Sequence, residues 1–350
     1  MKQEGLYGTG GKTAPKGSAQ QAPDSANARA VYFSGNKTVI VKKEQTERQA
    51  GTVFIESDCI GISHGTEMLF YRGQVPNDIP VDETLKTLDG ELQYPIKYGY
   101  VNTGTDEYGR QVFTFYPHQD KFFAPESELI ILPETVDMQD ALFIPNMETA
   151  LSIHQDLLLE PGSTLLICGL GVIGLLLTEI AVRRHFGKII CIDPIAKRRA
   201  AAEELGAVVL DPSVPNLQEG IMDAAGGRKI DWAVNLSTSG EGLQTCINSL
   251  GFEGTAIEGS WYGSKPVTLK LGSNFHRNRL NIRSVQVSSI SPRLSGRWTK
   301  KRRMETVLDL IESIQPKKYI THRFPMEEAS KAFDLIDREP DETIQTILLP

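Results

Sequence analysis

The sequence predicts an α/β protein that combines a β-rich part with a doubly wound parallel sheet. Two different residue patterns along the chain predict this division. Short β-type runs separated by Gly and Pro turns fill the part from Ala30 to near Met138, whereas strands and helices alternate after it. The chain has 350 residues, which exceeds the usual size of one domain, so two domains are expected.

The first 28 residues differ from the rest. They are rich in Gly, Ala, Ser, Gln and Lys and contain almost no large apolar side chains. Such a segment cannot bury enough surface to offset its ordering entropy, so residues 1–28 are expected to form a disordered tail. Apolar, β-branched and aromatic residues then predict strands at 30–33, 38–41, 52–56 and 111–115.

Helices and strands alternate in the second part. Helical spacing predicts a helix from Asp140 to Leu158. Strands are expected at 164–168, 188–192, 208–210, 230–236 and 254–258, with helices at 172–185, 196–205, 216–225 and 240–249. This alternation is typical of a doubly wound parallel sheet. Helices at 301–314 and 327–338 and a strand at 343–349 complete the chain.

A glycine pattern at the first of these strands indicates a dinucleotide site. The apolar run 164–168 leads into Gly169, Gly171 and Gly174, spaced Gly-x-Gly-x-x-Gly, and the next apolar run ends in Asp193. The first glycine permits a tight turn, the second lets the backbone approach a pyrophosphate, and the third lets helix and strand pack closely. Free N–H groups at the helix start then face the phosphates.

The acid that follows favours NAD over NADP. A carboxylate at Asp193 accepts hydrogen bonds from ribose hydroxyls and repels a 2′-phosphate, although Lys197 and Arg198 could still pair with one. Ser237 is expected near the adenine, and Gly259 near the nicotinamide. The candidate cofactor-binding residues are Gly169, Gly171, Val172, Ile173, Gly174, Asp193, Lys197, Arg198, Ser237 and Gly259.

Composition excludes several functional classes. The net charge of −7 and the pI near 5.5 argue against nucleic-acid binding. No apolar run is long enough for a membrane span, and the first residues lack the apolar core of a signal peptide. Four widely spaced cysteines in apolar surroundings are typical of reduced core residues. A cytoplasmic protein is therefore expected.

The order of parts resembles the medium-chain dehydrogenase/reductase superfamily. Three local segments carry the resemblance, namely 61–73, 95–104 and 320–333. The resemblance implies a GroES-like catalytic domain at 29–152 and 295–350, and a Rossmann dinucleotide-binding domain at 153–294. It also implies hydride transfer between a nicotinamide cofactor and a small-molecule substrate, in a homodimer.

The zinc ligands of that superfamily are missing. The Cys position holds Ser63 or His64, and the His and Glu positions hold Tyr100 and Val101. No zinc or other metal is therefore expected. The sequence is most similar to a zinc-less branch related to bacteriochlorophyllide dehydrogenases, through segments 61–67, 94–100, 117–120 and 146–150.

Without a metal, hydrogen-bond donors must stabilise charge on the substrate oxygen. The resemblance places Thr66 where the family has a substrate-binding hydroxyl, and Tyr100 and His64 near the vacated metal position. Either of the last two could instead fill space or cap a turn. Glu148 is a candidate base or a partner for the backbone, and Glu67 is expected to pair with an arginine.

An arginine-rich stretch follows near the end of the second part. Arg277, Arg279 and Arg283 are separated by even steps, so in a strand they would share one face, with His276 on the other. We expect His276, Arg279 and Arg283 to bind an anionic group of the substrate or cofactor. A charged strand edge or an oligomer contact would explain the same pattern.

Three functions fit these observations. The first is a zinc-independent NAD(P)-dependent oxidoreductase acting on an alcohol/carbonyl pair. The second is an enoyl- or quinone-type reductase. The third is a dinucleotide-binding protein without catalysis. The glycine pattern, Asp193 and Thr66 favour an enzyme.

Overall fold

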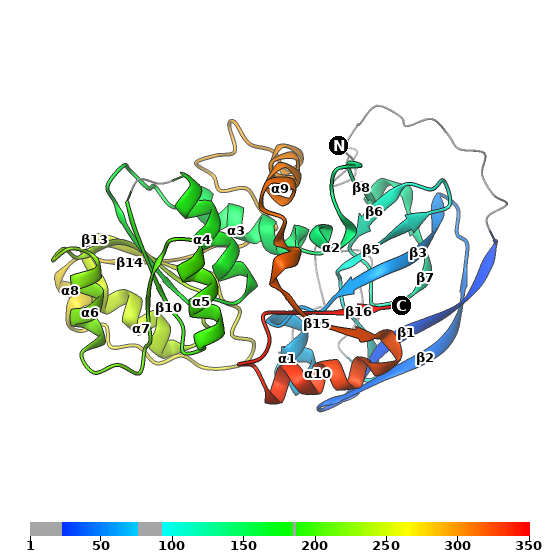
Figure 1. The fold of residues 1–350 in the computed structure, drawn as a ribbon, viewed down its shortest axis with the longest axis horizontal. Helices are drawn as coiled ribbons and strands as arrows, with labels where there is room; N and C mark the ends of the chain where they lie inside the picture. The colour runs from blue at the N-terminus through cyan, green and yellow to red at the C-terminus, as the bar shows by residue number, and fades with distance from the viewer. Residues whose placement is uncertain (1–22, 76–92, 185–186) are drawn as a thin grey trace. The chain divides into compact units, whose positions relative to one another are not determined.

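The computed structural model describes residues 23–75, 93–184 and 187–350 (Figure 1). Their contacts divide into two compact units. The first unit contains the residues up to Pro145 and from Pro292 onward, and the second unit is Asn146–Ser291. The sequence analysis places the corresponding boundaries after residues 152 and 294. In the part of the chain described, no helix combines the length and the apolar character needed to cross a bilayer.

The first unit is built mainly from two sheets. A three-stranded sheet has the order β2-β1-β4, and a seven-stranded sheet has the order β15-β16-β3-β5-β6-β8 with β7 paired to β3. The strands are β1 (Ser25–Gly35), β2 (Thr38–Glu47), β3 (Thr52–Gly61), β4 (Ile96–Lys97), β5 (Asn102–Asp106), β6 (Gln111–Thr114), β7 (Lys121–Pro125), β8 (Ile130–Ile131), β15 (Ile320–Pro325) and β16 (Gln345–Leu349). The last strand of the chain therefore completes a sheet begun near the amino end.

Short helices connect these strands. They are α1 (Thr66–Arg72), α2 (Met138–Ala141), α9 (Lys300–Ile314) and α10 (Ala329–Arg338), with 3₁₀ turns η2 (Glu126–Glu128), η3 (Pro316–Tyr319) and η4 (Met326–Glu328). Helix α3 (Ile144–Asp156) begins at the boundary between the units.

The expected amino-terminal tail is too long. Strand β1 begins at Ser25, which pairs with Glu47 of β2, so the end of the segment 1–28 belongs to a sheet. Pairing between backbone groups orders these residues without large apolar side chains, which the composition argument overlooked. Residues 1–22 lie outside the described part of the chain.

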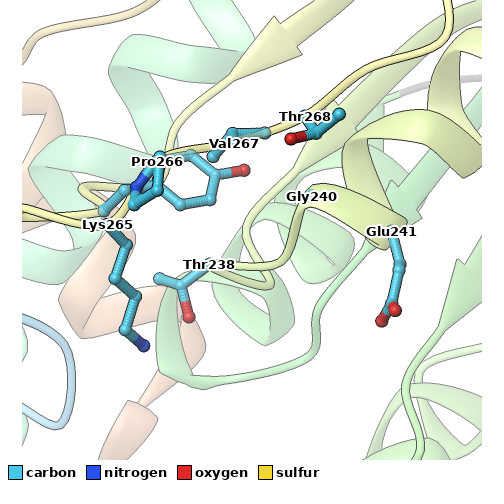
Figure 2. Close-up of a pocket in the computed structure, with 8 residues that line it drawn as sticks. Thr238, Gly240, Glu241, Lys265, Pro266, Val267 and Thr268 are labelled. Atoms are coloured by element: carbon cyan, nitrogen blue, oxygen red, sulfur yellow. The ribbon is translucent and has the colours of Figure 1, made fainter.

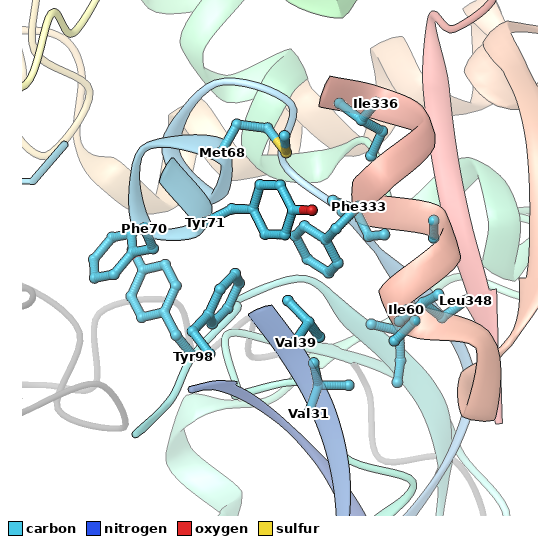
Figure 3. Close-up of a cluster of buried hydrophobic side chains, with 14 of the residues drawn as sticks. Val31, Val39, Ile60, Met68, Phe70, Tyr71, Tyr98, Phe333, Ile336 and Leu348 are labelled. Atoms are coloured by element: carbon cyan, nitrogen blue, oxygen red, sulfur yellow. The ribbon is translucent and has the colours of Figure 1, made fainter. Parts of the chain in front are cut away.

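An aromatic cluster forms the main core of the first unit (Figure 3). The rings of Phe70 and Tyr98 stack at 3.8 Å between centroids, and Phe33 meets Phe333 edge-on at 5.1 Å. Each buried aromatic side chain contributes about 1.5–3 kcal/mol through the hydrophobic effect. The cluster fixes α1 and α10 against the strands and thereby holds the loop before Thr66 in place.

The second unit is a six-stranded, fully parallel sheet in the order β11-β10-β9-β12-β13-β14. Its strands are β9 (Thr164–Cys168), β10 (Lys188–Ile192), β11 (Val208–Leu210), β12 (Ile230–Asn235), β13 (Leu250–Glu258) and β14 (Asn281–Ser284). Its helices after α3 are α4 (Val172–Arg184), α5 (Ala196–Glu204), α6 (Leu217–Ala224), α7 (Gly240–Ser249) and α8 (Asn274–Arg277).

Strand order determines where a ligand would bind in this sheet. The chain runs outward from β9 through β10 to β11, and then returns to the other side of β9 with β12. Ligands of doubly wound sheets bind beyond the carboxyl ends of the strands at such a reversal. The carboxyl ends of β9 and β12 are therefore the expected position of a site.

All four cysteines are free and buried. Cys168 ends β9, and Cys246 lies in α7 within the same apolar cluster. Cys191 lies in β10, where burial raises the pKa of its thiol to about 12. Cys168, Cys191 and Cys246 are core side chains of the second unit, whereas Cys59 lies in β3 of the first.

The helix expected over 140–158 is interrupted. Helix α2 ends at Ala141 and α3 begins at Ile144, so two helices replace the predicted one. Pro145 explains the break, because a proline ring clashes with the carbonyl four residues earlier in a continuous helix but is tolerated in a first turn. The periodicity argument did not take this proline into account.

Candidate functional site

The glycine loop joins β9 to α4 in the second unit. Gly169 has φ +100°, and a Cβ there would lie 2.6 Å from the carbonyl carbon of Leu236. A Cβ at Gly174 would lie 2.0 Å from the carbonyl oxygen of Gly169. Tight turning and close helix–strand packing therefore require these two glycines, as the sequence pattern predicts.

Gly171 has a different environment. Its φ lies outside the left-handed region, and a Cβ there would meet no protein atom within 4 Å. Neither backbone conformation nor packing among the described residues explains a glycine at this position. A ligand against the loop would explain it, because a side chain would occupy the ligand's space.

The first turn of α4 provides donors beside that open space. The helix begins at Val172, and the first intrahelical bond runs from the Leu175 N–H to the Gly171 carbonyl at 2.9 Å. The N–H groups of Val172, Ile173 and Gly174 precede it and have no partner within the helix. The loop and helix start thus fit the pyrophosphate of a dinucleotide.

Asp193 lies directly after β10 and holds the glycine loop. Its carboxylate accepts the N–H of Leu170 at 2.7 Å and that of Ile195 at 2.8 Å, and the residue is buried. Each carboxylate oxygen thus accepts one backbone bond and keeps a second lone pair for another donor. The sequence analysis did not predict this hydrogen bonding between Asp193 and the glycine loop.

The basic residues after Asp193 have different environments. Arg199 donates to the carbonyl of Asp193 at 2.7 Å and pairs with Asp211 at 2.8 Å. Lys197 is exposed and Arg198 is half-buried, both in the first turn of α5. Arg199 therefore fixes this turn.

A polar network at the carboxyl ends of β12 and β13 was missed by sequence reasoning. The side-chain amide of Asn235 donates to Glu258 at 2.8 Å and to the Tyr262 hydroxyl at 2.9 Å. The Tyr262 hydroxyl also donates to Glu258 at 2.9 Å. Burial and the Glu258 carboxylate raise the pKa of Tyr262 well above its usual value, so the hydroxyl remains a donor at neutral pH. These residues are too far apart in sequence to form a recognisable motif.

This network holds two of the predicted cofactor residues. The Ser237 hydroxyl donates to the Asn235 side-chain oxygen at 2.7 Å, and the Gly259 N–H donates to the Asn235 carbonyl at 3.0 Å. A Cβ at Gly259 would lie 2.8 Å from a methyl of Leu236. Packing therefore explains Gly259 without a ligand.

A cavity of about 260 Å³ lies at the same edge of the sheet (Figure 2). It separates the segment at the start of α7 from the loop after β13, as Figure 2 shows. Its lining residues are Thr238, Gly240, Glu241, Tyr262, Lys265, Pro266, Val267 and Thr268. The cavity adds polar and charged side chains, which sequence reasoning did not single out, to the carboxyl edge of the sheet.

In the first unit, the structure brings Tyr100 and Ser63 together. The Tyr100 hydroxyl donates to Ser63 Oγ at 2.7 Å. His64 Nε2 accepts the backbone N–H of Thr346 at 3.1 Å, so a neutral His64 carries its proton on Nδ1. Thr66 is half-buried at the first position of α1. Three of the predicted catalytic residues thus lie on or beside one loop.

The fourth predicted catalytic residue, Glu148, lies in α3 of the second unit and is buried.

The expectation that Glu67 pairs with an arginine is wrong. Glu67 contacts His118 instead, with 2.7 Å between Oε2 and Nε2, and neither side chain is exposed. The two residues are 51 positions apart, so no local pattern could reveal the pair.

The predicted arginine face is also wrong. His276 and Arg277 lie in α8, and β14 begins only at Asn281. Arg279 has φ +52° and pairs with Glu253 at 2.8 Å, whereas Arg283 donates to the carbonyl of Asp156 at 2.6 Å. His276, Arg279 and Arg283 therefore do not share a strand face, and their binding of an anionic group stays a prediction.

A side-chain bond explains why the expected strand is absent there. The amide of Asn274 donates to the carbonyls of Ile247 and Leu250 at 2.7 and 3.3 Å, which anchors the start of α8. These carbonyls lie more than twenty residues away in the sequence, so no local pattern reveals the bonds. The even spacing of the arginines was therefore coincidental.

The residues described do not fit a zinc ion. Zinc requires three or four nitrogen, sulfur or oxygen ligands at short range. His64 Nε2 accepts a backbone N–H, and Glu67 and His118 contact each other. Within residues 23–75, 93–184 and 187–350, no three His, Cys, Asp or Glu side chains gather as a metal site.

Comparison with known proteins identifies relatives of both sequence and fold. Residues 172–313 match the family described as zinc-binding dehydrogenase. Sorbitol dehydrogenase 1 of Saccharomyces cerevisiae is 25% identical over 239 residues, which cover 65% of this chain and 62% of that protein. D-guloside 3-dehydrogenase of Escherichia coli is 25% identical over 201 residues, 54% of this chain and 57% of the relative. The chain thus spans less than two thirds of these curated relatives.

A solved structure matches nearly the whole chain. The 2R,3R-butanediol dehydrogenase of Bacillus subtilis superposes with a TM-score of 0.75 at 17% identity, covering 92% of this chain and 99% of that one. This likeness confirms the predicted fold, a GroES-like β-rich part combined with a Rossmann parallel sheet.

Proposed function

We propose that this protein is an NAD(P)-dependent oxidoreductase that interconverts an alcohol and a carbonyl compound without zinc. The premise is its similarity to the zinc-binding dehydrogenase family, which residues 172–313 match, and to alcohol-dehydrogenase-like medium-chain dehydrogenases/reductases. The open space at Gly171, directly before α4, is the observation that supports it most, since a ligand against the loop would explain that glycine.

The second unit would hold the cofactor. The N–H groups at the start of α4 would bind the pyrophosphate, and the free lone pairs of Asp193 would accept the ribose hydroxyls. The bound nicotinamide would supply or accept a hydride. A buried carboxylate at the ribose favours NAD, because a 2′-phosphate would place like charges together.

The first unit would stabilise the substrate oxygen. That oxygen gains negative charge when a carbonyl carbon accepts a hydride, and donors placed in advance lower the barrier. Thr66 and the Nδ1–H of His64 are the candidate donors, and Tyr100, which donates to Ser63, would act through that hydroxyl. This arrangement would replace the Lewis acid of zinc-dependent relatives.

The names of the relatives support one substrate class. Sorbitol dehydrogenase 1 and D-guloside 3-dehydrogenase carry names of enzymes that oxidise a hydroxyl of a polyol or a sugar derivative. We therefore infer a small, uncharged polyhydroxy compound as the first substrate to test. The engaged side chains of Arg279 and Arg283 give no support for an anionic substrate.

A binding titration combined with metal analysis tests the proposal. Purified protein is titrated with NADH and NADPH by fluorescence, its zinc content is measured, and turnover is screened with sorbitol, L-arabinitol and 2,3-butanediol. We expect tighter binding of NADH, less than stoichiometric zinc and turnover of at least one alcohol. Absence of cofactor binding, or stoichiometric zinc required for turnover, would contradict the proposal. Turnover only with enones or quinones would assign an alkene-type reductase.

A further inference from the structure

Five residues of the first unit, Ser63, Glu67, Gly99, Tyr100 and His118, form a closed ring of contacts around the loop before α1. Tyr100 donates to Ser63 Oγ at 2.7 Å, and the Ser63 N–H donates to Glu67 Oε1 at 3.0 Å. The other oxygen of Glu67 lies 2.7 Å from His118 Nε2. The contacts thus link Tyr100 to His118 through Ser63 and Glu67.

Gly99 closes the ring. A Cβ at this residue would lie 2.4 Å from Cε1 and Nδ1 of His118, so the imidazole lies directly against the backbone of Gly99. Gly99 precedes Tyr100, and the His118 N–H also donates to the carbonyl of Tyr98. The position of Tyr100 therefore depends on the imidazole, and the imidazole is held by Glu67.

The pair at the base of the ring is sealed from solvent. The side chains of Glu67 and His118 are both 0% exposed. Glu67 accepts the Ser63 N–H through Oε1 and contacts His118 Nε2 through Oε2, so one carboxyl group engages both the loop and the imidazole. Hydrogen bonds to a carboxylate are short and strong, so the pair holds the loop rigidly.

The Ser63 hydroxyl can still donate one hydrogen bond. Ser63 is half-buried and accepts from Tyr100, and within the described residues its Oγ has no other hydrogen-bond partner. Its own hydrogen is therefore free to face a bound molecule. The Ser63 oxygen also keeps the Tyr100 proton within direct reach.

We propose that Ser63 is the catalytic residue that donates a proton to the substrate oxygen, that Tyr100 replenishes it, and that Glu67 and His118 are positioning residues. The inference rests on the proposed function and specifies the donor for that reaction. As the carbonyl carbon gains a hydride, the substrate oxygen takes the Ser63 proton and becomes a hydroxyl. Ser63 takes the Tyr100 proton, and water returns a proton to the phenolate. Oxidation of the alcohol reverses each transfer.

Four variants test the roles. Ser63→Ala removes the donor and Ser63→Thr retains a hydroxyl, whereas Tyr100→Phe removes the replenishing proton. Glu67→Gln removes the charge that holds the loop. Tyr94→Phe is the matched control, because Tyr94 also loses a hydroxyl bond, to the Phe70 carbonyl, but lies outside the ring.

The readouts are the NADH Kd, Tm, kcat and the solvent deuterium isotope effect on kcat, with the alcohol that gives the fastest turnover in the panel above. Ser63→Ala is expected to lower kcat by about 10²–10³-fold. Ser63→Thr should recover at least a tenth of the original kcat. Glu67→Gln should lower kcat about tenfold and change the isotope effect. The NADH Kd should stay within twofold in every variant, and Tyr94→Phe should leave kcat unchanged.

Two results would overturn the inference, and they differ from each other. If the unaltered protein binds NADH and turns over alcohol while Ser63→Ala keeps kcat within threefold, the donor is another residue, and only this inference fails. If neither NADH nor NADPH binds the unaltered protein, the proposed function fails and the assignment of Ser63 fails with it. A Ser63→Ala protein that does not fold is replaced by Ser63→Cys, whose weak donor should lower kcat as well.

Discussion

At the scale of single residues, the glycine loop contains two glycines that packing requires and a third, Gly171, that borders open space. A Cβ would collide with backbone at Gly169 and Gly174 but would meet open space at Gly171. Sequence reasoning predicted all three, because the motif is local and each position has its own physical cause. Only the three-dimensional structure distinguishes Gly169 and Gly174 from Gly171.

Replacement of Gly171 by alanine should therefore weaken cofactor binding without unfolding the protein. We expect the NADH Kd to rise at least tenfold and Tm to change by less than about 1 °C, since the added methyl meets no protein atom. Titration by fluorescence and thermal unfolding measure the two quantities. Gly296→Ala, at another open position, is the control and should change neither. An unchanged NADH Kd for Gly171→Ala would contradict a dinucleotide at the loop.

Asp193 should affect both cofactor choice and stability. Asp193→Ala leaves the N–H groups of Leu170 and Ile195 without their acceptor, which costs about 1–3 kcal/mol of unfolding free energy. It also removes the negative charge next to the ribose, so the ratio of the NADPH Kd to the NADH Kd should fall. Urea unfolding and paired titrations test both effects. A loss of stability with an unchanged ratio would show that the acid serves the loop alone.

At the scale of elements, one carboxylate links two helices of the first unit. Asp337 near the end of α10 bonds Arg72 at the end of α1 at 2.6 Å and Lys37 at 2.7 Å. Burial opposes its ionisation, but the bonds to Lys37 and Arg72 outweigh burial and lower the pKa of Asp337 below its usual value. The contribution to stability is therefore present above the ordinary pKa of an aspartate and is lost as the pH falls through the lowered value.

Asp337→Asn should accordingly destabilise the protein in a pH-dependent way. We expect a loss of about 1 kcal/mol at pH 7, since Lys37 and part of Arg72 are exposed to solvent. The difference between variant and unaltered protein should diminish progressively as the pH falls from about 4, the ordinary pKa of an aspartate, through the lowered pKa of Asp337. Unfolding free energies measured from pH 3 to pH 7 test this. A difference that is constant across the range would assign the loss to packing.

Helices and strands were predicted well where they follow from a local sequence pattern. They were predicted poorly where contacts with residues far away in the sequence determine the structure. The spacing of apolar runs located five of the six strands of the parallel sheet, β9 to β13, and the helices α4 to α7. The chain around Asn274 became a helix because its amide bonds carbonyls more than twenty residues away. The pairs Glu67–His118 and Asn235–Tyr262 join residues 51 and 27 positions apart, so no window of sequence contains both partners.

At the scale of the whole molecule, the two units carry different parts of the proposed reaction. The second unit contains the glycine loop and Asp193, and the first contains Ser63, Tyr100 and the buried pair beneath them. Sequence reasoning reached this division through the order of parts. The zinc-less branch, the homodimer and the cytoplasmic location stay predictions.

Metal removal tests the proposal for the molecule as a whole. Incubation with EDTA followed by desalting should leave Tm and turnover unchanged, because the described donors are engaged with protein groups. Added zinc chloride should not increase turnover. Loss of turnover that zinc restores would show that ligands have been overlooked and would contradict metal-free catalysis.

The buried thiols of the second unit can be used to measure the free energy of its local opening. Cys168 directly precedes Gly169, and neither it nor Cys246 is accessible in the folded state. A thiol reagent can modify them only when the sheet or α7 opens, so the labelling rate reports the free energy of that opening. A dinucleotide that binds only the closed form slows labelling in proportion to its occupancy. Cofactor affinity can thus be measured by chemical modification, without substrate and without turnover.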